Sequence, residues 1–262
     1  MSANPEPLLA TREGDVVTLV LNRPEKRNAM TLAMLNAFEA TLDELDHDTD
    51  CRLVLVRGAG EVAFSTGADI GSFGEQDRDA AWKTWVPAGH RVFGRLASLP
   101  MPTIAVLNGD ALGGGLELAL ACDLRLAVGE AMLGFPEARV GTLPGWGGTG
   151  RLVDAVGLSR ARQLVLTGIP IDAGRALAWG LVSDCAPRAS LSALVKRHVD
   201  AIQACAPLAL GLAKRVLAAY ATSERTTEAL ESLAAAVSVT TSDLSEGIAA
   251  FRQKRKPRFT GA

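Results

Sequence analysis

The chain has 262 residues, 48% of them hydrophobic and 21% charged, which suits one large packed domain or a main domain with an appendage and argues against extended disorder. Its formal net charge of −2 argues against a generic nucleic-acid or anionic-membrane surface. No apolar run approaches the roughly 20 residues that cross a bilayer, and the N-terminal residues lack the basic start and apolar run of a signal peptide, so we expect a cytoplasmic protein.

The cysteines and histidines show no metal-binding spacing. No CxxC or HExxH pattern occurs, and each cysteine lies among apolar or small residues, which predicts buried and reduced thiols. We therefore expect no metal site. The cysteines are Cys51, Cys122, Cys185 and Cys205.

The first strong element is a β-branched apolar run over residues 16–21, which stops at the turn sequence Asn22-Arg23-Pro24 and predicts a strand. Thr31 then has the character of a helix N-cap. Leucine and phenylalanine recur behind it at helical spacing, so we predict an amphipathic helix to about residue 45.

Three further apolar runs each end within two residues at a glycine. Short buried runs punctuated in this way are typical of strands in a parallel sheet with helices between them. We therefore predict an α/β fold. The runs cover residues 53–56, 103–107 and 124–128.

Residues 71–90 are the least patterned stretch, and Trp82 and Trp85 within it fit either a mobile loop over a site or a loop anchored by packed aromatics. From about residue 190 the strands give way to helices rich in alanine and leucine, which predicts close helix packing within or between subunits. The tail, residues 251–259, is strongly basic and fits either an anion site or a solvated face. The predicted helices cover residues 191–204, 207–220, 223–239 and 242–252.

The most informative stretch is NGDALGGGLE, residues 108–117. Its three glycines leave backbone N–H groups bare at the start of a helix predicted over residues 116–121, which favours an oxyanion site. Gly114 and Glu117 are three residues apart and face the same side of a helix, so a carboxyl lies one turn from an oxyanion donor. The alternative is that the glycines only permit tight packing and Glu117 caps the helix.

Two other stretches carry candidate groups. STGADI, residues 65–70, follows a strand and a turn and offers another bare N–H group, although many turns share this pattern. Glu137 follows a proline and precedes a glycine-rich bend into a helix, and it is the second carboxyl candidate. Paired carboxyls in a half-apolar site can have pKa values far enough apart for one to act as acid and the other as base.

The sequence GWGGTG, residues 145–150, fits the GxGxxG pattern of dinucleotide-binding proteins. That pattern requires a strand directly before it, and residues 140–144 do not have the character of a strand. Asp172 is better suited to capping a helix over residues 173–178 than to binding a ribose. We therefore do not expect a nicotinamide or flavin cofactor.

Taken together, five stretches resemble the crotonase superfamily, the enoyl-CoA hydratase/isomerase family, over nearly the whole chain and in the family's order. No single stretch is decisive, but the set at these separations is specific. The stretches are LNRPEKRNAM (21–30), STGADI (65–70), NGDALGGGLELALACD (108–123), FPEARVGTLPGWGGTGRL (135–152) and EGIAAFRQKRKPRF (246–259).

The resemblance implies an α/β fold built as a spiral of ββα units, followed by a C-terminal helical region that builds trimers, commonly paired into hexamers. On this basis we expect a spiral core over residues 1–195 that carries the active site, and a helical oligomerisation region over residues 196–262. The resemblance also implies an acyl-CoA thioester as substrate, with no separate cofactor.

The resemblance further implies an oxyanion hole formed by the N–H groups of Ala68 and Gly114, which would bind the thioester oxygen as it gains enolate charge. Family hydratases use two glutamates, matched here by Glu117 and Glu137, whereas family isomerases typically retain only the second. One carboxylate would activate water for attack at C3 and the other would supply a proton to C2. The implied substrate-binding residues are Lys26, Arg27, Ala29, Asp69, Ile70, Gly113, Trp146 and Lys256.

Some residues depart from the hydratase pattern. Phe135 and Trp146 stand where typical hydratases carry a glutamine and a small residue, and Trp146 could reshape the acyl pocket. Arg139 could pair with Glu137, bind an acidic acyl group or lie on the surface. An isomerase, another enolate-forming enzyme of the superfamily or an inert CoA-binding scaffold therefore remain alternatives to a hydratase.

Overall fold

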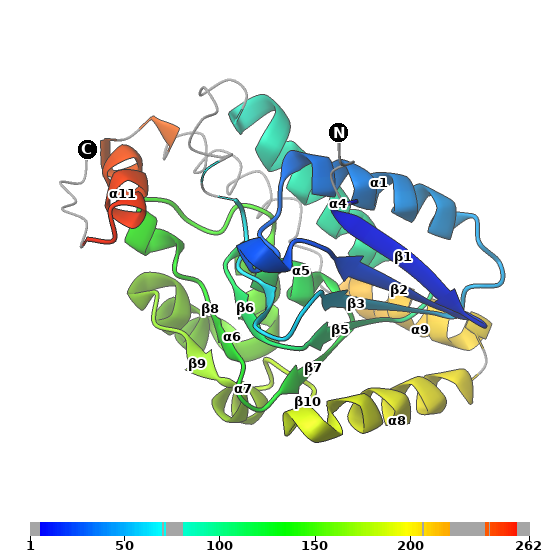
Figure 1. Cartoon of the computed structure of the whole chain (residues 1–262). Helices are drawn as coiled ribbons and strands as arrows, with labels where there is room; N and C mark the ends of the chain where they lie inside the picture. Colours follow the sequence, from blue (N-terminus) through cyan, green and yellow to red (C-terminus); the bar gives the residue numbers. More distant parts are fainter. Residues whose placement is uncertain are drawn as a thin grey trace.

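The computed structural model describes residues 6–69, 71, 81–205, 207–220, 239–240 and 242–255. In these ranges the chain forms two β-sheets surrounded by helices (Figure 1). None of the helices described is long and apolar enough to cross a membrane.

The larger sheet has six strands in the order β1-β2-β3-β5-β7-β10. β1 and β2 form an antiparallel hairpin that turns at Gly14 (φ +62°), and all other neighbours run parallel. The central strand β5 is buried throughout, as expected for a parallel strand covered on both faces. The strands are β1 (Leu8–Glu13), β2 (Val16–Leu21), β3 (Leu53–Gly58), β5 (Thr103–Leu107), β7 (Leu124–Val128) and β10 (Asp184–Ala186).

The smaller sheet has four short strands in the order β4-β6-β8-β9. β4, β6 and β8 each follow a strand of the larger sheet after a short turn, and a helix follows β6 directly. This repetition confirms the predicted spiral of ββα units. The strands are β4 (Ala63–Ser65), β6 (Asp110–Leu112), β8 (Met132–Gly134) and β9 (Ile171–Asp172).

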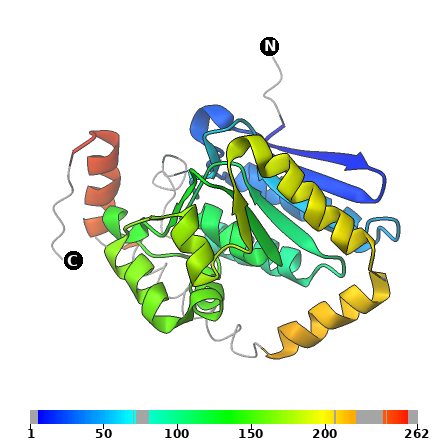
Figure 2. The same ribbon diagram turned by 90° about the horizontal axis from the view of Figure 1, so that it is seen from below.

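Helices α1 (Leu32–Asp46) and α4 (Val86–Ser98) pack against each other beside the larger sheet, on the side opposite α8 (Leu191–Gln203) (Figures 1 and 2). The predicted N-cap is confirmed, because the side chain of Thr31 accepts a hydrogen bond of 3.2 Å from the N–H of Met34.

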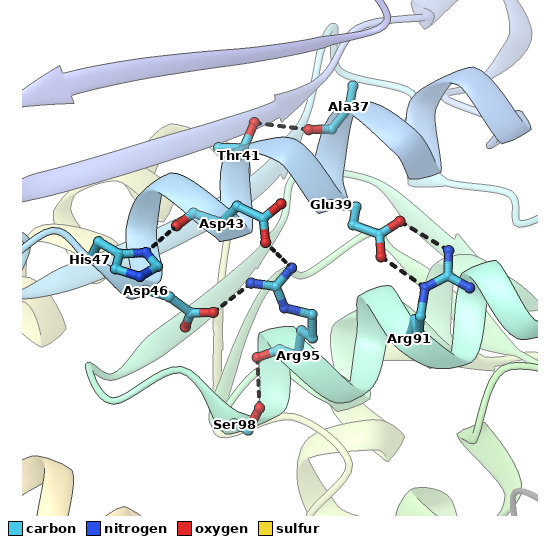
Figure 3. Close-up of polar contacts among 9 residues, drawn as sticks. All are labelled: Ala37, Glu39, Thr41, Asp43, Asp46, His47, Arg91, Arg95 and Ser98. Atoms are coloured by element: carbon cyan, nitrogen blue, oxygen red, sulfur yellow. Dashed lines mark hydrogen bonds and ion pairs between the residues drawn. The ribbon is translucent and has the colours of Figure 1, made fainter.

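Ion pairs line the outer side of the α1–α4 contact (Figure 3). Arg91 donates to both carboxylate oxygens of Glu39, at 2.8 and 2.9 Å, and these bonds lower the pKa of Glu39. Arg95 pairs with Asp43 and Asp46 on α1. Exposed pairs of this kind typically contribute less than about 1 kcal/mol each, so apolar packing beneath them holds the two helices together.

Helix α5 (Gly114–Ala121) is buried along its whole length and packs against α6 (Gly148–Thr167), which is kinked at Gly157. Helix α7 (Ala173–Trp179) is capped by Asp172, whose carboxylate accepts a hydrogen bond of 2.8 Å from the N–H of Arg175. This confirms Asp172 as a helix cap. The glycine pattern at 145–150 leads into α6 from a segment without a strand, so the dinucleotide fingerprint is absent there.

Three of the four predicted C-terminal helices are confirmed: α8, α9 (Pro207–Tyr220) and α11 (Ser242–Arg252). The fourth lies outside the described residues apart from Val239. Lys214 on α9 pairs with Asp123 at 2.8 Å and donates to the carbonyl of Met101 at 3.1 Å, which ties α9 to the edge of the core. Helix α11 contacts the 3-10 turn η3 (Glu137–Val140).

The structure corrects several expectations. Strand β1 was missed, because its exposed side chains (burial falls off after Leu8) give no continuous apolar run. The stretch 71–90 is partly helical, since a π-helical turn at Ala81–Trp85 leads into α4, and Trp85 is a packed anchor with 2% exposure. Residues 72–80 and the side chain of Trp82 lie outside the described residues.

The prediction of four buried thiols is wrong for two of them. Cys51 and Cys122 are buried, and burial raises the pKa of Cys122 to about 12. Cys185 is half-buried, and Cys205 is exposed because it follows the end of α8 in a connecting segment. All four are free thiols.

Candidate active site

Glu117 projects from α5 into the protein and is only 2% exposed. Its Oε1 accepts hydrogen bonds from the backbone N–H groups of Trp146, at 2.8 Å, and Gly148, at 2.9 Å. Burial raises the pKa of Glu117, while these N–H groups, that of Gly145 and the charge of Arg151 act in the opposite direction. The carboxyl is therefore fixed in position and able to take up a proton at a higher pH than an ordinary glutamate.

Two glycines permit this arrangement. Gly113 precedes α5 with φ +54°, a conformation that L side chains rarely adopt. A Cβ on Gly148 would lie 2.3 Å from Cγ of Glu117, so only glycine allows the loop before α6 to approach the carboxyl. Helix α5 begins at Gly114 rather than at residue 116 as predicted, and the glycine run is thus part of the helix start.

Glu137 lies in the turn η3 and points at the same glycine run. A Cβ on Gly113 would be 3.0 Å from Oε1 of Glu137. Gly113 is in turn bonded through its carbonyl to the N–H of Glu117, at 3.0 Å. Glu137 therefore lies beside the N-terminus of α5, the helix that carries Glu117, although the two residues are 20 positions apart in the sequence.

The two predicted oxyanion donors are also brought together. A Cβ on Gly67 would lie 2.8 Å from the nitrogen of Gly114, so the loop carrying Ala68 abuts the start of α5. Ala68 pairs with Met30 in a bridge that uses the carbonyl of Gly67 and the N–H of Asp69. Among the described residues the N–H groups of Ala68 and Gly114 have no acceptor, so both are available to a ligand.

The loop over residues 23–30 is held against this site by two residues that sequence analysis did not select. Arg23 pairs with Asp69 at 3.0 Å and donates to the carbonyl of Ala29 at 2.6 Å. Asn28 is completely buried and donates to two carbonyl groups, those of Ala59 (2.9 Å) and Ala63 (2.8 Å). In the sequence, only the turn residues of this stretch indicated a structural role for Arg23 and Asn28, because Asp69, Ala59 and Ala63 lie far along the chain.

The predicted binding residues of the same loop are placed differently from one another. Lys26 and Arg27 are exposed at its tip, and Arg27 adopts a left-handed conformation (φ +50°). Ala29 is half-buried next to the loop of Asp69. The remaining two candidates, Ile70 and Lys256, lie outside the described residues.

We expect Asn28→Ala to lower the free energy of unfolding by about 2–4 kcal/mol, because it leaves buried backbone groups without partners. Urea denaturation measures this change. Asn22→Ala is the matched control, since the side chain of Asn22 donates a hydrogen bond of 3.0 Å to the carbonyl of Glu6 at the surface. An equal loss in both variants would show that the buried network around Asn28 is not important for stability.

The three departures from the family pattern occupy distinct environments. Phe135 is fully buried in the core, and Trp146 is 4% exposed. Arg139 is exposed, and its side chain lies against Gly168. The surface alternative for Arg139 is therefore supported.

His90 on α4 is a polar group that sequence analysis did not single out. Both ring nitrogens are buried, and neither has a hydrogen-bond partner among the described residues. Burial, together with the positive charge of Arg151, lowers the pKa of His90 to about 4. The ring is therefore neutral at neutral pH.

This low pKa predicts acid sensitivity. The unfolded chain binds a proton at His90 near pH 6.5, before the folded protein does, so stability is lost as the pH falls from about 6.5 towards 4. We expect His90→Gln to lose less unfolding free energy than the parent protein between pH 7 and pH 4.5, measured by urea denaturation. Identical losses would contradict this assignment.

Comparison with known proteins identifies the family to which the chain belongs. The enoyl-CoA hydratase/isomerase family model matches residues 11–262. The short-chain-enoyl-CoA hydratase of Clostridium acetobutylicum is 36% identical over 250 residues, which cover 95% of each chain. The mitochondrial enoyl-CoA hydratase domain-containing protein 2 of Mus musculus is 36% identical over 94% of this chain and 84% of its own length.

Two solved structures have a closely similar fold. An enoyl-CoA hydratase from Mycobacterium avium subsp. paratuberculosis has a TM-score of 0.88 at 30% identity, covering 97% of this chain and 98% of its own. A carnitinyl-CoA hydratase from Mycobacterium avium has a TM-score of 0.86 at 32% identity, covering 99% of this chain and all of its own (100%). The chain belongs to the enoyl-CoA hydratase/isomerase family.

Proposed function

We propose that the protein is an enoyl-CoA hydratase, which adds water across the double bond of a 2-enoyl-CoA to give a 3-hydroxyacyl-CoA. The observation that carries this proposal is that α5 carries the buried carboxyl of Glu117, while the carboxyl of Glu137 lies against Gly113 at the glycine-rich start of the same helix. Hydration needs both a base for water and an acid for carbon, and two carboxyls in different environments can supply both.

The thioester oxygen would accept hydrogen bonds from the N–H groups of Ala68 and Gly114. As water attacks C3, charge moves from the double bond onto this oxygen and forms an enolate. Donors fixed in advance stabilise that charge more than the ground-state carbonyl, and each contributes about 3 kcal/mol to lowering the barrier. The start of α5 adds the positive end of a helix dipole.

Each of the two carboxyls makes one proton transfer in the proposed reaction. One carboxylate takes a proton from the attacking water while the oxygen–C3 bond forms. The C2–C3 double bond becomes a single bond in this step, and a C1–C2 double bond forms in the enolate. The other carboxyl then gives a proton to C2, the C1–C2 bond becomes single and the thioester carbonyl re-forms. The bonds from Trp146 and Gly148 hold Glu117 in place during both transfers.

For the CoA portion we propose Lys26 and Arg27 at the exposed loop tip, with backbone groups of Ala29, Asp69 and Gly113 nearer the thioester. Ile70, Lys256 and the side chain of Trp146 complete the proposed substrate site. Because CoA is part of the substrate, we propose that the reaction uses no separate cofactor.

We also propose that residues 1–195 form the catalytic core and that the helical region after residue 195 builds a homotrimer or a hexamer of paired trimers. A cytoplasmic location is our further proposal, supported by the four free thiols, which suit a reducing compartment.

The test is loss of enoyl-thioester absorbance on a panel of 2-enoyl-CoA substrates, with wild type beside Glu137→Gln. We expect turnover by the wild type and a loss of about 10²–10⁴-fold in kcat in the variant. Glu130→Gln, on the exposed turn between β7 and β8, is the control and should retain full activity. Turnover of 3-enoyl-CoA that survives Glu117→Gln, without hydration, would instead establish an isomerase.

A further inference from the structure

The indole of Trp146 lies directly against the start of α5. A Cβ on Gly114 would be 2.5 Å from Cζ3 of Trp146, and a Cβ on Gly89 would be 2.1 Å from its Cδ1. The ring is therefore clamped between two glycines, one on α5 and one on α4. Neither glycine could be replaced without moving the ring.

Aromatic neighbours fix the ring further. Phe93 meets it edge-on, with centroids 5.4 Å apart, and Trp85 lies 6.0 Å away at a tilt of 33°. Contacts of this geometry are favourable beyond simple burial and disfavour other rotamers. The side chain of Trp146, which is 4% exposed, is consequently held in one rotamer.

Trp146 contacts both a proposed acid/base group, Glu117, and a proposed oxyanion donor, Gly114. The backbone N–H of Trp146 donates to Glu117, while its ring covers the α-carbon of Gly114, whose N–H faces the thioester oxygen in our proposal. The reacting carbons C2 and C3 must lie between these groups. Our proposal therefore places the acyl chain beyond C3 against the same indole.

We propose that Trp146 closes the acyl pocket and restricts the substrate to short-chain 2-enoyl-CoA thioesters. This inference rests on the proposed hydratase function. A smaller side chain at position 146 would leave a hollow next to Gly114 and Glu117, lined by Phe93 and Trp85, into which further methylene groups fit. Each methylene gained or lost in such a pocket changes specificity by roughly 10-fold or more.

The experiment compares kcat/KM of wild type and Trp146→Ala on 2-enoyl-CoA substrates of four, six, eight and ten carbons. We expect the wild type to prefer the shortest substrates and Trp146→Ala to shift the eight-to-four-carbon ratio by at least about 10-fold towards the longer chain. Trp179→Ala is the matched control, because Trp179 packs between Arg160 and Arg175, outside the aromatic cluster of Trp146. It should leave the ratio unchanged.

Two further measurements keep the proposal testable. If Trp146→Ala does not fold, Trp146→Leu replaces it, with thermal unfolding as the check. Binding of saturated acyl-CoA of the same lengths, measured by calorimetry, reports pocket length without chemistry and should show the same shift. A wild type that hydrates all lengths equally, or a folded variant with an unchanged length profile in both assays, would overturn the inference. A wild type that hydrates no substrate but binds short acyl-CoA selectively would overturn only the proposed function.

Discussion

Glu117→Gln should lower kcat for hydration of a 2-enoyl-CoA by about 10²–10⁴-fold and leave the fold intact. Glutamine keeps an oxygen that can accept the N–H groups of Trp146 and Gly148, so the loop before α6 retains its anchor. It cannot exchange a proton with water or carbon. Steady-state kinetics, with CoA binding by calorimetry and thermal unfolding on the same samples, separate lost chemistry from lost structure.

The matched control is Glu61→Gln, since Glu61 is exposed on the turn before β4. The control should behave as wild type. Because burial raises the pKa of Glu117, the pH profile of the parent enzyme should also contain an ionisation above the usual glutamate range, absent from Glu117→Gln. Full activity in Glu117→Gln would contradict the assignment of Glu117 as an acid/base group.

Gly247→Ala should lower kcat by about 10-fold or more, although residue 247 lies in α11 and far from Glu137 in sequence. A Cβ at this position would be 2.2 Å from the carbonyl oxygen of Val140, a backbone atom that cannot rotate away. Helix α11 and the turn η3 must then separate, and η3 carries Glu137. A misplacement of about 1 Å in a reacting group can cost about 100-fold in rate.

Gly211→Ala supplies the control for Gly247→Ala. A Cβ at Gly211 would press on the carbonyl oxygen of Pro100, at 2.9 Å, and would disturb α9 without touching η3. Both variants should lose some thermal stability, but only Gly247→Ala should show a fall in kcat larger than its change in KM. Equal effects on kcat would mean that the contact with η3 only stabilises the fold.

The sequence predicted β2, β3, β5 and β7 of the larger sheet, because each is an apolar run ended by a turn signal. It missed β1 and β10, which are not continuous apolar runs. It did not predict β4, β6 and β8, which have only three residues each and no period that can be counted. These short strands form because they add successively to a second sheet, an arrangement decided by tertiary contacts. The resemblance to the family, not the local pattern, predicted that layer.

The residues of the candidate site also differ in how far the sequence indicated their roles. Local sequence patterns made Gly114, Glu117 and Glu137 candidates, while the assignment of Ala68 as the second oxyanion donor came from the resemblance. The roles of Arg23 and Asn28 could not be predicted, because their partners are separated from them by up to 46 residues and meet only when the sheets assemble. The backbone N–H groups that bind the Glu117 carboxylate could not be predicted from the sequence either.

The loop before α6 divides two tasks between its backbone and one side chain. The N–H of residue 146 anchors Glu117, and every amino acid except proline provides that N–H. The side chain at the same residue is then free to vary without removing the anchor. Natural selection could therefore broaden or narrow the range of acyl groups through single codon changes at this position, while the reaction itself is inherited unchanged.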